Sequence, residues 1–339
     1  MRVLASAPGK LVIAGEYAVL EGAPALVLAI DRQARVTLEH SDGGDYEITA
    51  PGLGIHAAHG RLDTAGRIGW PALDAAAGTS LRLVGAILET LGAEDRPPPF
   101  RASLDTRAFH AGGDRPRKLG LGSSAALTVA LASAIHALGR RGTPSLDTLL
   151  AAHRRAQDGR GSGLDVAASL HGGLLVYRLH DGRPRIAPAT WPQGLQWCCV
   201  WSGRPASTQL FLQQLAAWRA RAPARHAAAM RELGDCATAA AGATGAAALV
   251  EAVAAYALAL DRLAAASGLD IFCLEHRALA ALAARLGVTY KTCGAGGGDI
   301  GIALATDGAR LQAFRRAATA AGFPVLDLHP AAAACVQVH

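Results

Sequence analysis

The stretch that most constrains the fold of this chain is Lys118-Leu119-Gly120-Leu121-Gly122-Ser123-Ser124-Ala125-Ala126, which runs into an apolar segment ending at Leu138. Two closely spaced glycines, two serines and a stripe of aliphatic residues predict a tight turn that leads into the N-terminus of a helix. The first backbone N–H groups of a helix have no partner within it and carry the positive end of its dipole. The stretch therefore predicts an anion site. The alternative is a capped helix after a glycine turn.

Composition narrows the class of ligand. The chain has 339 residues, 51% of them hydrophobic and 18% charged, which is typical of a globular protein larger than one ordinary domain. Its net charge is +6, but the arginines are scattered and no basic block alternates with aromatic residues. We therefore expect a small anionic ligand and no nucleic acid.

Cysteine usage and apolar runs indicate the compartment. Six cysteines show no CxxC spacing, so we expect reduced thiols, no zinc site and a cytoplasmic location. No apolar run has the length of a signal peptide core or of a membrane span, and we expect no membrane association.

In the first half of the chain, hydrophobic patterns predict a β-rich start followed by helices. We expect strands over 2–6, 11–13, 25–30, 34–39, 46–49, 100–105 and 173–178, and an irregular connection through most of 43–77. Helices are expected from Ser80 to Gly92, from Ser124 to Leu138 and from Ser145 to Asp158. The segment Asp181–Pro192 holds three prolines and is the candidate domain boundary.

The second half is predicted to be mainly helical. A strand is expected over 197–201, and then a helix that opens at Ser207-Thr208 and carries Phe211, Leu215 and Trp218 on one face. Alanine-rich helices are expected over 224–241, 246–266 and 272–287. A glycine loop then enters a strand over 302–305 and a helix over 308–321.

Three further stretches carry residues suited to phosphate chemistry. They are Pro8-Gly9-Lys10 with Gly15-Glu16-Tyr17, then Ser162-Gly163-Leu164-Asp165, and finally Gly294-Ala295-Gly296-Gly297-Gly298-Asp299. Taken singly, a lysine after a turn is usually solvated and an aspartate at a helix start is commonly a cap. The glycine loops match neither the P-loop nor the Rossmann spacing.

In their order and approximate spacing, these motifs resemble the GHMP kinase superfamily over nearly the whole chain. In their individual residues, the motifs are most similar to those of the phosphomevalonate kinase family. Mevalonate kinases are near relatives, but they more often have Gly-Glu-His in the first motif and a glutamate for Mg²⁺ on the helix ahead of the aspartate motif. Here that helix reads His153-Arg154-Arg155.

The resemblance implies an α+β fold of two domains. Residues 1–185 would form a ribosomal protein S5 domain 2-like N-terminal domain with the ATP loop, and residues 186–339 a ferredoxin-like C-terminal domain. ATP and substrate would meet in the cleft between them, in a monomer or a homodimer.

The resemblance also implies roles for individual residues, with ATP and Mg²⁺ as cofactors. Lys10 and Asp165 are expected to be catalytic and to lie side by side, with Asp165 either accepting a proton or orienting the acceptor. ATP is expected to bind at Lys118, Gly120, Leu121, Gly122, Ser123, Ser124 and Ala125, with Ser124 as the Mg²⁺ ligand. The substrate is expected at Lys10, Tyr17, Lys118, Ser162, Gly163, Asp165, Ser207, Ala295, Gly296 and Gly297.

The implied activity is ATP-dependent phosphorylation of 5-phosphomevalonate to 5-diphosphomevalonate, a step of isoprenoid precursor synthesis. Two alternatives stay open: a mevalonate kinase or another small-molecule kinase of the superfamily, and a catalytically silent protein of this fold that binds a metabolite and regulates another process.

Overall fold

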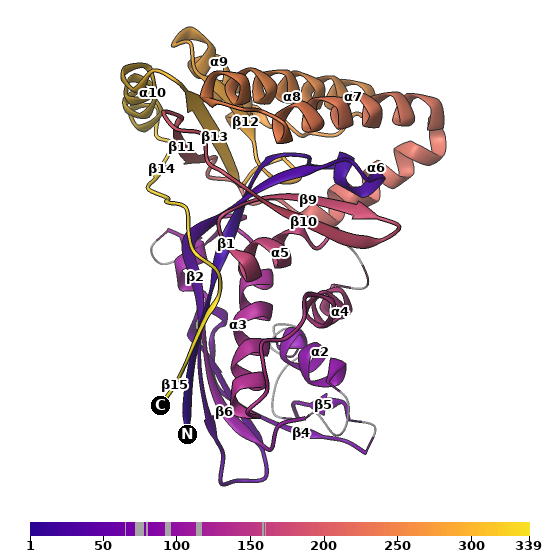
Figure 1. Cartoon of the computed structure of the whole chain (residues 1–339), viewed down its shortest axis with the longest axis vertical. Helices are drawn as coiled ribbons and strands as arrows, with labels where there is room; N and C mark the ends of the chain where they lie inside the picture. The colour runs from indigo at the N-terminus through magenta and orange to yellow at the C-terminus, as the bar shows by residue number, and fades with distance from the viewer. Residues whose placement is uncertain are drawn as a thin grey trace.

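The computed structural model describes residues 1–64, 66–71, 78, 81–91, 96–112, 117–157, 159 and 161–339. In the part described, two sheets are each covered by helices, one in the lower and one in the upper part of Figure 1. The predicted α+β class is confirmed. The ends of the helix predicted from Ser80 to Gly92 lie outside the described residues.

Most of the first sheet is antiparallel, and its path runs β10-β9-β2-β6-β3-β4-β5, with β1 pairing with both β2 and β15. Its strands are β1 (Arg2–Ala14), β2 (Ala25–His40), β3 (Tyr46–Ala50), β4 (Ile55–Leu62), β5 (Ile68–Gly69), β6 (Phe100–Asp105), β9 (Leu174–His180), β10 (Arg183–Ala189) and β15 (Cys335–Val338). Short 3₁₀ turns lie at Ala18–Glu21, Pro51–Leu53 and Arg107–Phe109, and β7 (His110–Ala111) pairs with β8 (Arg117–Lys118) in a separate hairpin.

Three predictions for this sheet were wrong. The expected turn at Pro8-Gly9-Lys10 is part of the single strand β1, where a register shift marks a bulge between Pro8 and Gly9. The strands predicted over 25–30 and 34–39 form the single strand β2, and the stretch predicted as irregular contains β4 and β5. Gly9 is required at the bulge because a Cβ there would lie 2.7 Å from the Leu121 carbonyl oxygen.

Four helices belong to this sheet: α2 (Arg82–Thr90), α3 (Ser123–Leu138), α4 (Leu146–Ala156) and α5 (Leu164–His171). The helices α3 and α5 pack against β1 and β2, and α2 packs on α4 (Figure 1). This packing brings the start of α3 and the start of α5 to the same stretch of β1.

The second sheet has the order β12-β13-β11-β14, with every neighbouring pair antiparallel. Its strands are β11 (Gln196–Trp201), β12 (Thr289–Thr292), β13 (Ile300–Ala305) and β14 (Val325–Leu326), and its helices are α6 (Thr208–Arg221), α7 (Pro223–Ala241), α8 (Ala246–Ser267), α9 (Leu274–Arg285) and α10 (Gly308–Ala320). Strand β13, which pairs with β12 as a hairpin, lies between β12 and β11. This is the split βαβ order expected of a ferredoxin-like unit.

The first sheet extends past the predicted border at residue 185. Strand β10 crosses that border and pairs with β9, so most of the segment predicted to hold the domain boundary is a strand of the first sheet. It is the edge strand, where proline is tolerated because a missing N–H breaks no ladder. The last strand, β15, returns to β1, and the two termini lie side by side (Figure 1). Among the helices described, none is both long enough and apolar enough to cross a lipid bilayer.

Candidate active site

The glycine loop is shaped to receive an anion. Gly122 is the N-cap of α3 with φ 83°, and Gly120 has φ 77°, a region that favours glycine. A side chain at Gly120 would collide with the Asp299 carboxylate. In the described part of the chain, the hydroxyls of Ser123 and Ser124 have no hydrogen-bond partner. The open N-terminal turn of α3 and these two hydroxyls therefore supply donors for phosphate oxygens.

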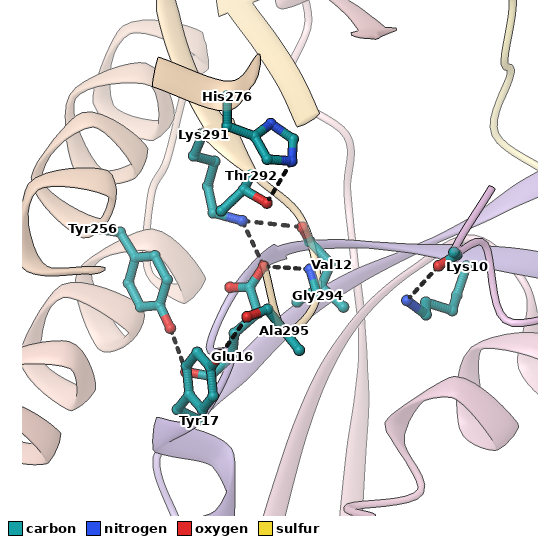
Figure 2. Close-up of polar contacts among 11 residues, drawn as sticks. Lys10, Val12, Glu16, Tyr17, Tyr256, His276, Lys291, Thr292, Gly294 and Ala295 are labelled. Carbon is teal, nitrogen blue, oxygen red and sulfur yellow. Dashed lines mark hydrogen bonds and ion pairs between the residues drawn. The ribbon is translucent and has the colours of Figure 1, made fainter. Parts of the chain in front are cut away.

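Lys10 joins this loop to strand β1. Its backbone N–H donates to the Leu121 carbonyl at 2.9 Å, and its Nζ donates to the Gly120 carbonyl at 3.2 Å (Figure 2). A Cβ at Gly122 would lie 3.0 Å from the Lys10 Cγ, so the lysine stem packs directly on the loop. The ammonium group is thereby held at the glycine loop without a carboxylate partner in the described part of the chain.

Lys10 also lines a cavity of about 200 Å³ between the two sheets. Six of the predicted site residues line it: Lys10, Tyr17, Ser162, Gly163, Asp165 and Ala295. Residues that the sequence did not single out for the site also line it, among them Glu16, His153, Arg154, Thr208 and Leu212. The volume suits a small molecule, and the lining combines charged groups with aliphatic side chains.

Asp165 lies in the first turn of α5, and its position argues against a capping role. The N-cap of α5 is Gly163, with φ 83°, and the Asp165 Oδ1 accepts from the adjacent Val166 N–H at 3.0 Å. The carboxylate lines the same cavity as Lys10, but the Lys10 Nζ bonds the Gly120 carbonyl and makes no ion pair with Asp165 in the part of the chain described. A ligand between the two groups would therefore meet both.

Four of the residues predicted to bind the substrate do not line this cavity in the described structure, and neither do residues 120–125 of the predicted ATP loop. Lys118 is exposed on β8, and Ser207 is the exposed N-cap of α6, where it accepts from the Leu210 N–H at 3.4 Å. A Cβ at Gly296 would lie 2.6 Å from the Ile271 carbonyl oxygen, and one at Gly297 would collide with the Phe211 ring. These two glycines allow close packing around the loop.

Asp299, at the end of the last glycine motif, ties that motif to the anion loop. Its Oδ1 accepts from the Ala206 N–H at 3.1 Å, and its side chain occupies the space beside Gly120. Burial raises the pKa of the Asp299 carboxyl, whereas the Ala206 N–H and the charges of Lys10 and Lys118 lower it. Lys118 therefore acts electrostatically at the anion loop, although it does not line the cavity.

A buried ion pair beside the cavity connects the two sheets (Figure 2). Lys291 on β12 is fully buried and its Nζ lies 2.5 Å from the Glu16 Oε1, with Glu16 only 5% exposed. The Lys291 Nζ also donates to the Val12 carbonyl at 3.4 Å, and the Gly294 N–H donates to the Glu16 Oε1 at 3.2 Å. Glu16 thereby holds strand β12 and the start of the last glycine motif against the end of β1. No local sequence signal pairs two residues this far apart.

Two tyrosines complete this connection. The Tyr17 hydroxyl donates to the Ala295 carbonyl, and the Tyr256 hydroxyl on α8 donates to the Glu16 carbonyl at 2.6 Å (Figure 2). Burial, and then the Glu16 charge, raises the pKa of Tyr17, so its phenol stays protonated. Tyr17 has φ 63°, a strained value for a non-glycine residue that the surrounding contacts hold in place. Its hydroxyl is engaged by the protein, so the ring is the part left to face a ligand.

The described residues include no cluster of three or more His, Cys, Asp or Glu side chains that could hold a metal ion. The Ser124 hydroxyl at the anion loop, which has no hydrogen-bond partner among the described residues, suits Mg²⁺, which is typically bound by few protein oxygens together with substrate phosphates. The residues therefore fit a magnesium ion that arrives with a nucleotide.

Comparison with known proteins identifies the family. The family model described as the GHMP kinases N terminal domain matches residues 82–173. A phosphomevalonate kinase from Streptomyces sp. (strain CL190) is 33% identical over 341 residues, covering 89% of each chain. The chain belongs to the GHMP kinase family.

Two other similarities are partial or structural. A mevalonate kinase from Methanothermobacter thermautotrophicus is 36% identical over 177 residues, which cover 52% of this chain and 50% of the relative. The solved structure of Streptococcus pneumoniae phosphomevalonate kinase in complex with phosphomevalonate and AMPPNP superposes with a TM-score of 0.76 at 20% identity, covering 97% of this chain and 99% of the other. The superposition on the Streptococcus pneumoniae structure establishes a shared fold.

Proposed function

We propose that this chain is an ATP-dependent kinase that phosphorylates 5-phosphomevalonate to 5-diphosphomevalonate. The observation that carries the proposal is the position of Lys10, which bonds the anion loop at Gly120 and lines the cavity that also holds Asp165. A nucleotide on the loop and an acceptor in the cavity would meet at this lysine. The similarity to the Streptomyces phosphomevalonate kinase over 89% of both chains supports this choice of acceptor.

The residues suit phosphoryl transfer, in which positioning and charge stabilisation supply most of the catalysis. An oxygen of the acceptor phosphate forms a bond to the γ-phosphorus of ATP as the bond from that phosphorus to the β-γ bridging oxygen breaks, and ADP leaves. Lys10 neutralises charge on the transferring group. Asp165 takes the proton that a phosphate monoester with a second pKa of about 6 still partly carries near neutral pH.

The α3 N-terminus, with Gly120, Gly122, Ser123 and Ser124, would hold the ATP phosphates. Ser124 would hold Mg²⁺, which supplies positive charge to the phosphate oxygens. The ring of Tyr17 and the backbone of Ser162, Gly163 and Ala295 would bound the acceptor.

Release of ADP by the purified protein, measured with phosphomevalonate, mevalonate and related alcohols, tests the proposal. We expect ADP release with phosphomevalonate and the appearance of a diphosphate signal in ³¹P NMR. A clear preference for mevalonate would make the chain a mevalonate kinase. No release with any acceptor would favour a silent metabolite-binding protein.

Replacing Ser124 with alanine should impair the use of Mg²⁺·ATP more than it impairs stability. The Ser124 hydroxyl has no partner in the described structure, and the N-cap is Gly122, so no capping hydrogen bond is lost. We expect kcat/KM for ATP to fall by about 10-fold or more, as for a lost hydrogen bond to a charged group, with a change of unfolding free energy within about 0.5 kcal/mol. Titration of activity against Mg²⁺ and urea denaturation measure the two effects. Early melting with normal activity would reverse the assignment.

A further inference from the structure

The charged side chains that line the cavity leave an excess of positive charge once a buried ion pair is taken into account. Its lining includes two cations, Lys10 and Arg154, and two carboxylates, Glu16 and Asp165. Glu16 is already neutralised by the buried Lys291, which lies 2.5 Å away. Asp165 is therefore the one carboxylate among these lining residues that has no ion-pair partner in the described part of the chain, and it shares the cavity with two cations. The cavity is suited to an anion that brings further negative charge.

Arg154 is the cation that the proposed mechanism does not yet use. It lies on α4, is half-buried, and makes no ion pair or hydrogen bond with the protein in the described part of the chain. The next residue, Arg155, shows the usual arrangement: its Nε donates to Glu89 at 2.7 Å on the exposed side of the same helix. A guanidinium that lines a cavity with no carboxylate partner is poised to bind an anionic ligand.

Arg154 and Asp165 line the same cavity. The pKa of Tyr177 is raised to about 12, mainly by burial. The Arg154 charge lowers this pKa and the Asp165 charge raises it, so Arg154 and Asp165 both act on the Tyr177 phenol. The Tyr177 hydroxyl donates to the Ser162 carbonyl at 2.5 Å, in the turn that leads to Asp165. The Arg154 guanidinium is therefore available to a ligand that occupies the cavity beside Asp165.

We propose that Arg154 binds the phosphate of the acceptor and thereby selects a phosphorylated substrate over its unphosphorylated alcohol, an inference that rests on the proposed function. A guanidinium presents a planar fork of N–H donors that matches two phosphate oxygens, and it is always protonated. Together with Lys10 it offsets the repulsion between the acceptor phosphate and the nucleotide phosphates. An acceptor without a phosphate would leave Arg154 unpaired, which disfavours it.

The test compares Arg154→Met and Arg154→Lys with the matched control Arg155→Met, one residue away on the same helix. We expect Arg154→Met to raise KM for phosphomevalonate by about 10- to 100-fold, as for a lost charge-assisted contact, and to leave KM for ATP within about twofold. Arg154→Lys keeps the charge but loses the fork and should fall between wild type and the methionine variant. Arg155→Met should behave as wild type.

Isothermal titration of phosphomevalonate and of mevalonate gives a second readout that does not require turnover. The affinity for phosphomevalonate should fall by a similar factor in Arg154→Met, whereas the affinity for mevalonate should hardly change. Unchanged KM and affinity, or an equal loss in Arg155→Met, would overturn the role of Arg154. Failure of the wild type to phosphorylate phosphomevalonate would instead overturn the proposed function, and it would be seen before any variant is made.

Discussion

Replacing Asp165 with alanine is expected to lower kcat by about 100-fold or more, the usual contribution of a positioned acid or base. The side chain lines the cavity and, among the described residues, bonds only the adjacent Val166 N–H, so its loss removes little from the core. We expect ATP affinity and the denaturation midpoint to stay close to those of the wild type. Steady-state kinetics, nucleotide titration and urea denaturation measure the three quantities.

The pH dependence of this variant separates the two roles open to Asp165. If the carboxylate removes the remaining proton of the acceptor phosphate, whose second pKa is about 6, the deficit should shrink as pH rises from about 5.5 to 8 because the acceptor then deprotonates in solution. A deficit that is constant with pH would indicate orientation alone. Asp165→Asn is the matched control, since it keeps the size and the hydrogen bonding but accepts no proton. Near-normal turnover in both variants would show that Asp165 has no part in the reaction.

Local patterns predicted much of the fold. In α6, the three residues assigned to one face, Phe211, Leu215 and Trp218, are all buried, and the helix opens at Ser207-Thr208 as predicted, with Ser207 as its N-cap. The glycine-serine turn into α3 was also correctly predicted, because glycine conformation and helix start signals act within a few residues. These elements depend on neighbours in the sequence, which is the information that a single sequence contains.

The wrong predictions arose where a polar residue within a strand has its hydrogen-bond or ion-pair partner in a segment far away in the sequence. Strand β2 continues through Asp31 and Arg32 because both residues find partners near the end of the chain. The Asp31 backbone N–H donates to the His329 carbonyl, and the Arg32 guanidinium donates to the Asp327 carbonyl. Strand β12 was missed because it contains Lys291, whose charge is neutralised by Glu16. Periodicity cannot show such partners.

The candidate site likewise contains residues that the sequence pointed to and residues whose importance only the structure shows. Lys10 and Asp165 line one cavity, and the side-by-side placement that the family resemblance implies stays a prediction. The sequence distinguishes Arg154 only as a departure from the mevalonate kinase pattern, because its significance depends on its having no ion-pair partner among the residues that the structure describes. The buried pair that holds the two sheets together was likewise visible only in the structure.

Replacing Lys291 with methionine is expected to cost about 3–5 kcal/mol of unfolding free energy, because it leaves the Glu16 carboxylate buried without its cation. The lysine is fully buried and Glu16 is 5% exposed, so water cannot compensate. The matched control is Arg262→Met, which breaks an exposed pair with Glu232 and should cost less than about 1 kcal/mol. Urea denaturation at constant pH, followed by circular dichroism, measures both changes.

The double variant Glu16→Gln with Lys291→Met isolates the cause. A neutral amide needs no buried cation, and replacing both partners of a buried pair is often close to neutral, so the double variant should recover most of the loss seen in Lys291→Met. Its stability should then exceed that of the single variant even though it contains more substitutions. A double variant as unstable as Lys291→Met would mean that the lysine stabilises the protein through contacts other than the Glu16 ion pair, such as those of its ammonium group with the Tyr256 ring and the Val12 carbonyl.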